Sequence, residues 1–291
     1  MSKNYFLAIA SYKDEWKQDF FENIVSKRNK EYCKIHDLEY IEITKNVSPV
    51  RGNYMWFNSF EQERIINEEL NYGDGLIFVD ADAIISNINV DLLPNNEKHF
   101  SYAIDSANTH CLGYVSMIKS DWTQEMLSLV NDEKRYNSQI NEKTFHERKK
   151  EKTSFWEEFG YQASWYSLAG IRRHSDTSFW DLPNYGWHSQ VNEWTYYSIE
   201  DLEKHVEILP TKFNVTEIKG ESPCLNNINK VKVNEVVIRH FAGGQKWRKQ
   251  WTNTNTLYFK ILKINIFKYI NFYKIRTFIQ RVRGYIKSKL S

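Results

Sequence analysis

The sequence predicts an α/β fold with a mostly parallel central sheet. In the first hundred residues, short apolar segments of strand length alternate with longer segments whose apolar residues have helical spacing. The chain has 291 residues, of which 41% are hydrophobic and 15% aromatic, enough for a large domain with a sizeable core. This composition excludes a mainly disordered chain. No apolar run approaches the roughly 20 residues of a membrane-spanning helix, which excludes a multi-spanning membrane protein.

The predicted elements follow in chain order, strands from short apolar runs and helices from apolar residues three to four positions apart. Strands are expected at 5–10, 38–43, 76–79, 101–104, 113–118, 207–209 and 235–239, and helices at 15–36, 57–70, 122–130 and 156–169. The charged segment 131–152 predicts a loop or an exposed helix. The aromatic-rich segment 176–194 lacks periodicity and is typical of a binding loop.

Charge is unevenly distributed along the chain. The formal net charge is +2, but residues 246–291 carry twelve Lys or Arg and no acidic residue. The preceding 245 residues carry 27 basic and 37 acidic residues, a net charge of −10. We therefore expect a domain at 1–250 and a basic aromatic tail at 251–291 whose partner has the opposite charge.

The cysteines and the N-terminal sequence indicate the cellular compartment. The three cysteines, at 33, 111 and 224, form no Cys-x-x-Cys pair, so neither a disulfide framework nor a zinc site is indicated. The apolar run near the N-terminus is short and acidic residues follow it, which is not the pattern of a signal peptide. We expect a cytoplasmic protein; the alternative is a secreted protein whose leader was removed.

Two aspartates follow the third predicted strand directly. Asp80-Ala81-Asp82 comes after the apolar run 76–79. In an extended segment, side chains two residues apart point to the same side, and the carboxyl ends of strands in an α/β sheet face the ligand crevice. Carboxylates at that place suit Mn²⁺ or Mg²⁺ bridging a diphosphate. The alternative is a solvated turn.

A second polar motif follows the last predicted strand. His240 could complete the metal shell of the two aspartates, because a neutral imidazole is a good metal ligand. Gly243 lets the backbone approach a phosphate closely, and Lys246 could neutralise a leaving diphosphate. The alternative is a structural histidine followed by a glycine turn.

Together, these two motifs resemble those of retaining glycosyltransferases of the GT-A fold, a Rossmann-like fold that binds nucleotide sugars. The family hallmarks are a DxD after a sheet strand, here at 80–82, and a C-terminal HxxGxxK, here at 240–246. Within this group the chain looks most like the galactosyl- and mannosyltransferases of family 34. Shorter similar stretches lie at 29–40, 158–163, 208–214 and 240–243, so the resemblance covers roughly residues 5–250.

The chain also departs from the family pattern. Tyr161 stands where family 34 commonly has an acidic residue before the glutamine matched here by Gln162. Glu157 or Glu158 could supply the acid, or it could be absent. The Gly-to-Lys spacing of the last motif follows the neighbouring family 8. The donor sugar is therefore open between galactose and glucose.

The resemblance implies roles for further residues. Ala10, Ser11 and Tyr12 would cradle the nucleotide base and ribose, and the alternative is an ordinary strand-to-helix turn. Asp105 would contact the donor sugar or simply end a strand. Gln162 would lie on the reactive face of the sugar or be a polar helix residue.

The expected donor and catalytic contacts form one set. Asp80, Ala81, Asp82, Gly243 and Lys246 would bind the donor diphosphate, with Asp105, Gln162 and Lys246 in the catalytic step.

Acceptor candidates are aromatic and histidine side chains of the predicted loops. Trp180, Tyr185 and Trp187 are suited to stacking on sugar faces, and the alternative is that they pack in the core. His188 could help to form an acceptor pocket. His110 flanks another predicted acceptor loop, although isolated histidines are usually structural.

The basic tail predicts an interfacial membrane segment. Its cations alternate with Tyr, Phe, Ile and Leu, so aromatic rings could lie among lipid headgroups and the cations on anionic lipid. Lys246 belongs to the catalytic motif, which leaves eleven cations at 247–291 for the membrane. The alternatives are a helix packed on the domain and nucleic-acid binding; no nucleic-acid-binding module accompanies the tail, so we expect no nucleic acid.

We therefore expect a peripheral protein of the inner membrane face that transfers a hexose from a UDP-sugar to a glycan or glycolipid hydroxyl. Two other classes remain. A nucleotidyltransferase would need an early glycine-rich loop, which 10–15 lacks. A non-catalytic sugar-binding module would not need the metal and phosphate residues.

Overall fold

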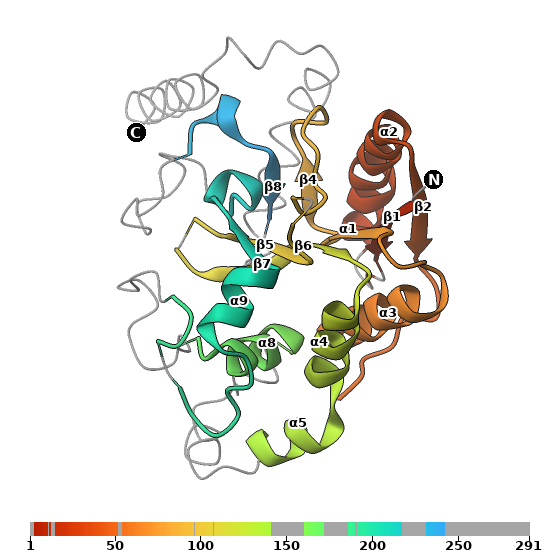
Figure 1. Ribbon diagram of the computed structural model, residues 1–291. Helices are drawn as coiled ribbons and strands as arrows, with labels where there is room; N and C mark the ends of the chain where they lie inside the picture. Colours follow the sequence, from red (N-terminus) through yellow and green to blue (C-terminus); the bar gives the residue numbers. More distant parts are fainter. Residues whose placement is uncertain are drawn as a thin grey trace, which may run out of the picture.

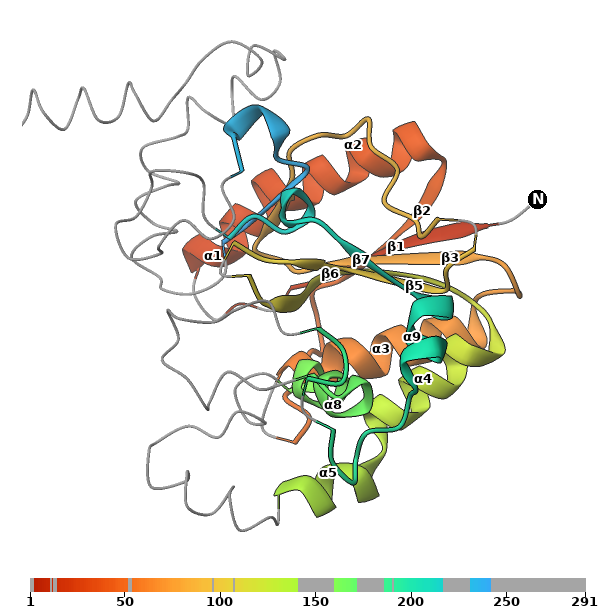
Figure 2. The same cartoon turned by 60° about the vertical axis from the view of Figure 1, so that its left-hand side comes forward.

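The structure is a computed structural model and describes residues 3–10, 12, 15–51, 54–95, 97–106, 108–140, 160–171, 186–189, 191–216 and 231–241. In the described residues, a central sheet lies between two layers of helices (Figures 1 and 2). Its strands are β1 (Asn4–Ile9), β2 (Leu38–Ile43), β3 (Gly75–Val79), β5 (Phe100–Ile104), β6 (His110–Ile118) and β7 (Val206–Leu209).

The strand order is β2-β1-β3-β6-β5-β7. β1 pairs in parallel with β2 and β3, β5 pairs in parallel with β7, and β6 is antiparallel to both of its neighbours. Five of the six strands therefore run in one direction. The predicted α/β class with a mostly parallel sheet is confirmed, and the arrangement is consistent with a GT-A, Rossmann-like fold.

Helices cover both faces of the sheet because the strand side chains alternate between two apolar clusters (Figure 2). One face carries α3 (Tyr54–Glu68), α4 (Asp121–Asn131), α8 (Tyr161–Ala169) and α9 (Ile199–His205). The other carries α1 (Glu15–Phe20), the π-helical turn η1 (Phe21–Val25) and α2 (Ser26–His36). α5 (Glu133–Ile140) lies in the charged segment for which a loop or exposed helix was expected.

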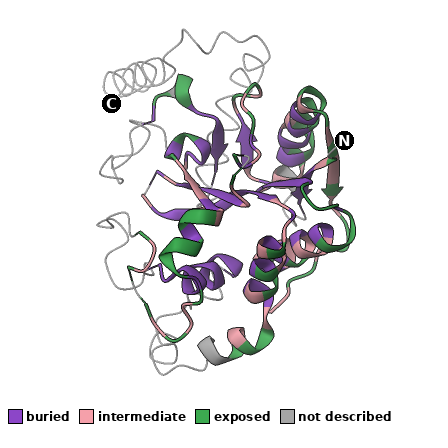
Figure 3. Cartoon of the chain, viewed as in Figure 1, coloured by how far each residue is buried: buried purple, intermediate pink, exposed green. Residues whose placement is uncertain are grey.

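A second, two-stranded sheet joins the middle of the chain to its later part. β4 (Ala83–Ile85) pairs antiparallel with β8 (Ile238–His240), with Ala83 opposite His240. All six residues of these strands are buried, as Figure 3 shows in purple. This pairing places the end of β8 beside the end of β3, from which β4 continues.

Two of the observed elements begin several residues later than predicted. The strand expected at 235–239 begins at Ile238, because Val233–Glu235 form a short 3-10 turn (η5) closed by a Glu235 N–H bond to the Lys232 carbonyl. The helix expected at 156–169 begins at Tyr161, because Gly160 has a φ of 50°, which is not helical; residues 156–159 lie outside the described residues.

Within the described residues, no helix has both the length and the apolar character that crossing a bilayer requires.

Candidate metal centre

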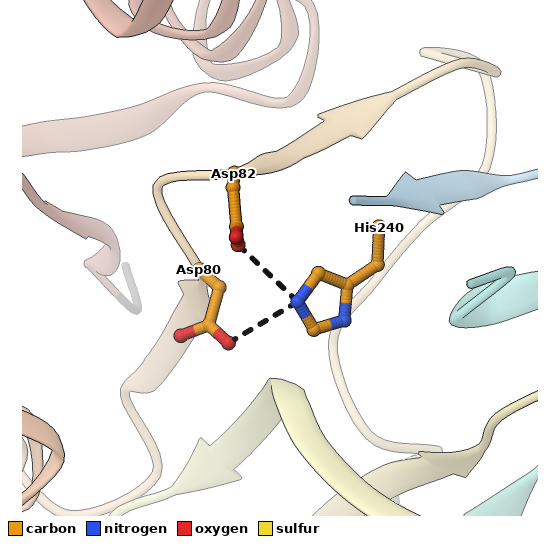
Figure 4. A group of neighbouring side chains, drawn as sticks. All are labelled: Asp80, Asp82 and His240. Carbon is orange, nitrogen blue, oxygen red and sulfur yellow. Dashed lines mark ion pairs between the residues drawn. The ribbon is translucent and has the colours of Figure 1, made fainter. Parts of the chain in front are cut away.

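Asp80, Asp82 and His240 lie together at the carboxyl end of β3 (Figure 4). One ligand atom from each lies within 4.8 Å of the others. The His240 Nε2 atom is 3.2 Å from Asp82 Oδ1 and 3.5 Å from Asp80 Oδ2. His240 is buried and the two carboxylates are half-buried. The two motifs that are far apart in the sequence therefore form one cluster, at the edge of the sheet where ligands of α/β proteins bind.

The backbone between the two aspartates forms a tight turn. The Asp80 N–H donates to the Gly113 carbonyl, and the Ala83 N–H donates back to the Asp80 carbonyl at 2.9 Å. The expected extended conformation of this segment is wrong, because the chain must reverse from β3 into β4. The carboxylates still converge on His240, since the Phe241 N–H bonds to the Asp82 carbonyl and fixes β8 beside the turn.

Asn214 sets the orientation of the His240 ring. Its Oδ1 lies 2.9 Å from His240 Nδ1, and its Nδ2 donates to the Cys111 carbonyl at 3.5 Å. An amide oxygen only accepts, so Nδ1 carries a proton and Nε2 is the ring nitrogen that faces the carboxylates. Metal-ligating histidines are commonly fixed by such a second hydrogen bond. Asn214 is fully buried, as expected for a supporting residue.

The surroundings of His240 favour a positive charge. Burial lowers the pKa of the ring. Hydrogen bonds and electrostatic interactions with Asp82 and with the Cys111 thiol raise this pKa by a larger amount. The pKa of His240 therefore lies well above its usual value. Without a metal ion, an imidazolium balances the two carboxylates. A divalent cation would take the place of that proton, because only the neutral ring can be a ligand.

Gly113 on β6 forms the wall behind the ligands. A Cβ atom on this residue would lie 2.3 Å from His240 Cε1 and 3.0 Å from Asp80 Oδ2. A side chain at position 113 would therefore overlap the imidazole as it is placed here. The glycine is needed for a close approach between a strand and a ring, since φ at this position is not positive.

Ala10 and Tyr12, two of the residues expected to bind the nucleotide, lie at the carboxyl end of β1. Ala10 is buried, and its N–H donates to the Ile43 carbonyl of β2 at 2.9 Å. Tyr12 is half-buried, its N–H donates to Gln18 Oε1, and the Lys17 ammonium lies 5.7 Å from the centre of its ring. Ala81, in the turn between the aspartates, is buried. The roles of these residues remain predictions.

Asp105 and Gln162 both have internal partners. Asp105 closes the loop between β5 and β6: its Oδ1 accepts from the Thr109 N–H at 3.0 Å, and its own N–H donates to the Thr109 carbonyl. Gln162, on α8, is 5% exposed, and its Oε1 accepts from the Leu112 N–H at 2.9 Å. The predicted contacts of these two residues with the sugar remain predictions.

The described acceptor candidates pack beside α8 and β5. His110 is buried, with Nδ1 2.6 Å from the Tyr102 hydroxyl. Trp187 Nε1 donates to the same hydroxyl at 3.4 Å, and His188 Nε2 lies 2.7 Å from the Tyr197 carbonyl. The named ring nitrogens therefore bond within the protein, and acceptor binding by these side chains remains a prediction.

Several expected residues lie outside the described residues. They are Ser11, Trp180, Tyr185, Gly243, Lys246, the alternative acids Glu157 and Glu158, and the tail at 251–291.

No role was predicted for Gly113 or Asn214. Asn214 belongs to a stretch that carries the family resemblance, and that was the only signal for it. Gly113 was assigned to the start of a predicted strand, where nothing in the sequence shows that an imidazole from β8 packs against it.

No protein-family model matches the chain. No curated protein matches it in sequence. A structural match covers 85% of this chain and 98% of the other, with a TM-score of 0.45 and 11% sequence identity. The matched protein is a glycosyltransferase involved in the glycosylation of the major capsid of PBCV-1.

Proposed function

We propose that the protein is a metal-dependent glycosyltransferase that moves a hexose from a UDP-sugar to a hydroxyl of a glycan or glycolipid. The observation that carries the proposal is the convergence of Asp80, Asp82 and His240 Nε2 at the carboxyl end of β3. These residues come from the two motifs that resemble those of the retaining GT-A enzymes. Their meeting in space is what a shared diphosphate-binding metal would require.

The chemistry of the three side chains fits a divalent cation. Two carboxylates supply hard oxygen donors, and the ring nitrogen facing them belongs to an imidazole whose other nitrogen is bonded to Asn214. An imidazole is a softer donor than a carboxylate, which favours Mn²⁺ over Mg²⁺. Three protein ligands leave coordination positions for phosphate oxygens. When bound, the cation would neutralise charge that develops on the leaving diphosphate.

In the proposed reaction, the bond between the anomeric carbon and the UDP oxygen breaks while the acceptor oxygen bonds to the same carbon. The acceptor attacks from the face that the diphosphate leaves, and its proton passes to the leaving phosphate. The configuration is therefore retained without a covalent enzyme intermediate. Lys246 and the backbone at Gly243 would contact the diphosphate, and Gln162 and Asp105 the sugar. Galactose and glucose are the donor sugars we propose.

Calorimetric titration of UDP with and without Mn²⁺ tests the donor site. We expect UDP binding to depend on Mn²⁺ and to be lost in the variant that combines Asp82→Asn with His240→Ala. Asp91→Asn is a matched control, because Asp91 is an exposed acid outside the cluster and Asn keeps an oxygen for the Leu93 N–H. Unchanged Mn²⁺-dependent binding in the double variant would disprove the site.

Activity distinguishes the proposed enzyme from the other two classes. A thermal-shift screen of nucleotide sugars with Mn²⁺ identifies the donor, and transfer to candidate glycans is then measured with it. A sugar-binding module would bind UDP-sugar and Mn²⁺ without hydrolysis or transfer. A nucleotidyltransferase would release pyrophosphate from a nucleoside triphosphate.

We further propose that the tail at 251–291 holds the domain on the inner membrane face. The support is its composition, nine cations interleaved with aromatic and aliphatic residues, preceded by Arg248 and Lys249. Truncation after Trp251 should abolish sedimentation with anionic vesicles and leave UDP binding intact. Equal sedimentation of the full and truncated chains would reject membrane attachment through the tail.

A further inference from the structure

β5 and β6 lose their pairing register beside the metal cluster. Tyr102 pairs with Val115, but the next residue, Ala103, pairs with Cys111. Residues 112–114 of β6 therefore have no counterpart on β5 and form a bulge. Tyr114 still pairs with Val79 of β3 on the other side, and the Gly113 carbonyl accepts from the Asp80 N–H. Leu112, at the start of the bulge, pairs with neither strand.

Side chains of α8 supply the partners that Leu112 lacks. Gln162 Oε1 accepts from the Leu112 N–H, and the Tyr161 hydroxyl donates to the Leu112 carbonyl, each at 2.9 Å. Tyr166 donates to the His110 carbonyl and accepts from Gln162 Nε2. All three α8 side chains are at most 5% exposed. Buried backbone groups need such partners, so α8 takes the place of the missing strand.

The bulge determines where the metal ligands lie. Gly113 is its central residue, and its α-carbon faces the His240 ring so closely that a Cβ would overlap it. The same backbone holds Asp80 through the Gly113 carbonyl. A shift of the bulge would therefore move the wall behind His240 and the anchor of Asp80 together.

We infer that Tyr161 and Gln162 are positioning residues of the metal centre, which hold the bulge at 112–114 so that Gly113 backs His240 and Asp80. The inference rests on the proposed metal-dependent function. Both polar atoms of the Gln162 amide bond to the protein, so this residue acts on the metal centre through β6 whether or not the amide also contacts the sugar.

Mn²⁺ affinity without nucleotide, measured by electron paramagnetic resonance, tests the inference. Tyr161→Phe removes the donor to the Leu112 carbonyl and keeps the ring, and Gln162→Met removes the amide at similar length. We expect each to weaken Mn²⁺ binding by about tenfold, as for other residues that support metal ligands. Ser164→Ala is the matched control: it removes a buried hydrogen bond of α8 to the Val130 carbonyl of α4, away from β6.

Ser164→Ala should lower the melting temperature but change Mn²⁺ affinity by less than about twofold, since ligand geometry is untouched. If Gln162→Met lowers transfer while Mn²⁺ affinity stays at the wild-type value, Gln162 acts on the sugar and the inference is overturned. It is also overturned if all three variants weaken Mn²⁺ binding equally.

The His240 ring resonances of the metal-free protein give a readout that does not depend on a metal. They should shift in Tyr161→Phe and Gln162→Met but not in Ser164→Ala. A wild type that binds no Mn²⁺ rejects the proposed function, while these resonances still decide whether α8 positions His240.

Discussion

The two ends of the central sheet each place a histidine against other titratable groups, with opposite results. At the carboxyl end, His240 faces Asp80 and Asp82. At the amino end, His99 precedes β5, His205 precedes β7, and their Nδ1 atoms are 2.8 Å apart. Opposite charges meet at the first end and like charges would meet at the second, so the same residue type serves two different purposes.

The pKa shifts follow this difference. Burial lowers the pKa of His240, but the Asp82 carboxylate and the Cys111 thiol raise it above its usual value. Burial lowers the pKa of both His99 and His205, and the positive charge of Lys204 lowers both further. For His205, the His99 ring and Lys98 also lower the pKa, while Asp201 raises it. Trp122 stacks on the His205 ring. A hydrogen bond between two Nδ1 atoms needs one donor and one acceptor, so the pair is not compatible with two protonated rings. The carboxyl end is suited to a cation, and the amino end to remaining neutral.

The largest expected effect is the loss of a ligand at the carboxyl end. Asp82→Asn should weaken Mn²⁺ binding at least about a hundredfold, beyond the range for residues that only support ligands. His205→Gln, at the amino end, should leave Mn²⁺ affinity within about twofold of the wild type. Isothermal titration measures the Mn²⁺ affinity of both variants. Equal losses of affinity would contradict the predicted difference between the two ends of the sheet.

The second largest effect is expected when a methyl group is added at a glycine of the carboxyl end. Gly113→Ala should weaken Mn²⁺ binding by about ten- to a hundredfold, because its Cβ would displace the His240 ring. Gly75→Ala is the matched control at the start of β3, where the Cβ would lie 2.5 Å from the Leu93 Cδ2 atom, the end of a flexible side chain.

Both alanine variants should lose about 1–3 kcal/mol of unfolding free energy from overpacking, measured in urea. A Gly113→Ala variant that binds Mn²⁺ with wild-type affinity would contradict the role of Gly113 behind His240.

A smaller loss is expected at Asn214, which does not touch the ligand. Asn214→Leu removes the acceptor for His240 Nδ1–H and should weaken Mn²⁺ binding by about tenfold. Asn214→Asp keeps an oxygen at that place and should retain most of the affinity. If both variants bind alike, the ring is not oriented through Nδ1.

The smallest expected effect is on the pH dependence of folding stability, through the histidine pair at the amino end. The pKa of each paired histidine is lower in the fold than the unfolded value of about 6.5, so the unfolded chain binds more protons as the pH falls below that value. The pair's contribution to stability is therefore present above about pH 6.5 and is lost as the pH falls towards the folded pKa values.

Urea unfolding of metal-free wild type and His205→Gln between pH 7.5 and 5.5 measures this loss. The variant should lose less stability on acidification, by below about 1 kcal/mol since both rings are partly exposed. Because His240 is present in both proteins, the difference isolates the pair. Parallel pH profiles would show that the pair does not couple to folding.

The parts of the site that could be predicted from the sequence depend on local patterns. The run Gly75–Val79 is apolar at every position after the glycine and is fully buried in the fold, so the acidic pair after it could be placed at a strand end. The position of His240 could be predicted because it follows a second apolar run. Their contact could be predicted from metal-ligand chemistry and the family motifs, and not from the parallel sheet, because β8 pairs with β4 outside it.

The remaining features depend on contacts between distant segments. The turn at Asp80–Ala83 exists because β4 must return to pair with β8, a pairing that no local pattern shows. Gly113 and Asn214 matter only because the His240 ring lies between them. The strand end at His240 lies one residue beyond the predicted strand, because His240 pairs with Ala83 of β4.

The pairing of β4 with β8 also bears on the order in which the protein folds. The cluster exists only after β8, near the end of the described chain, has found a strand formed in its first third. Closing so long a loop is slow, and the contact gains nothing until it is complete. Cation binding should therefore appear only in the last stage of refolding. A fluorophore near the site that is quenched by the bound metal would therefore detect when β4 and β8 have paired. A cation added to the unfolded chain would not change the folding steps that precede this pairing.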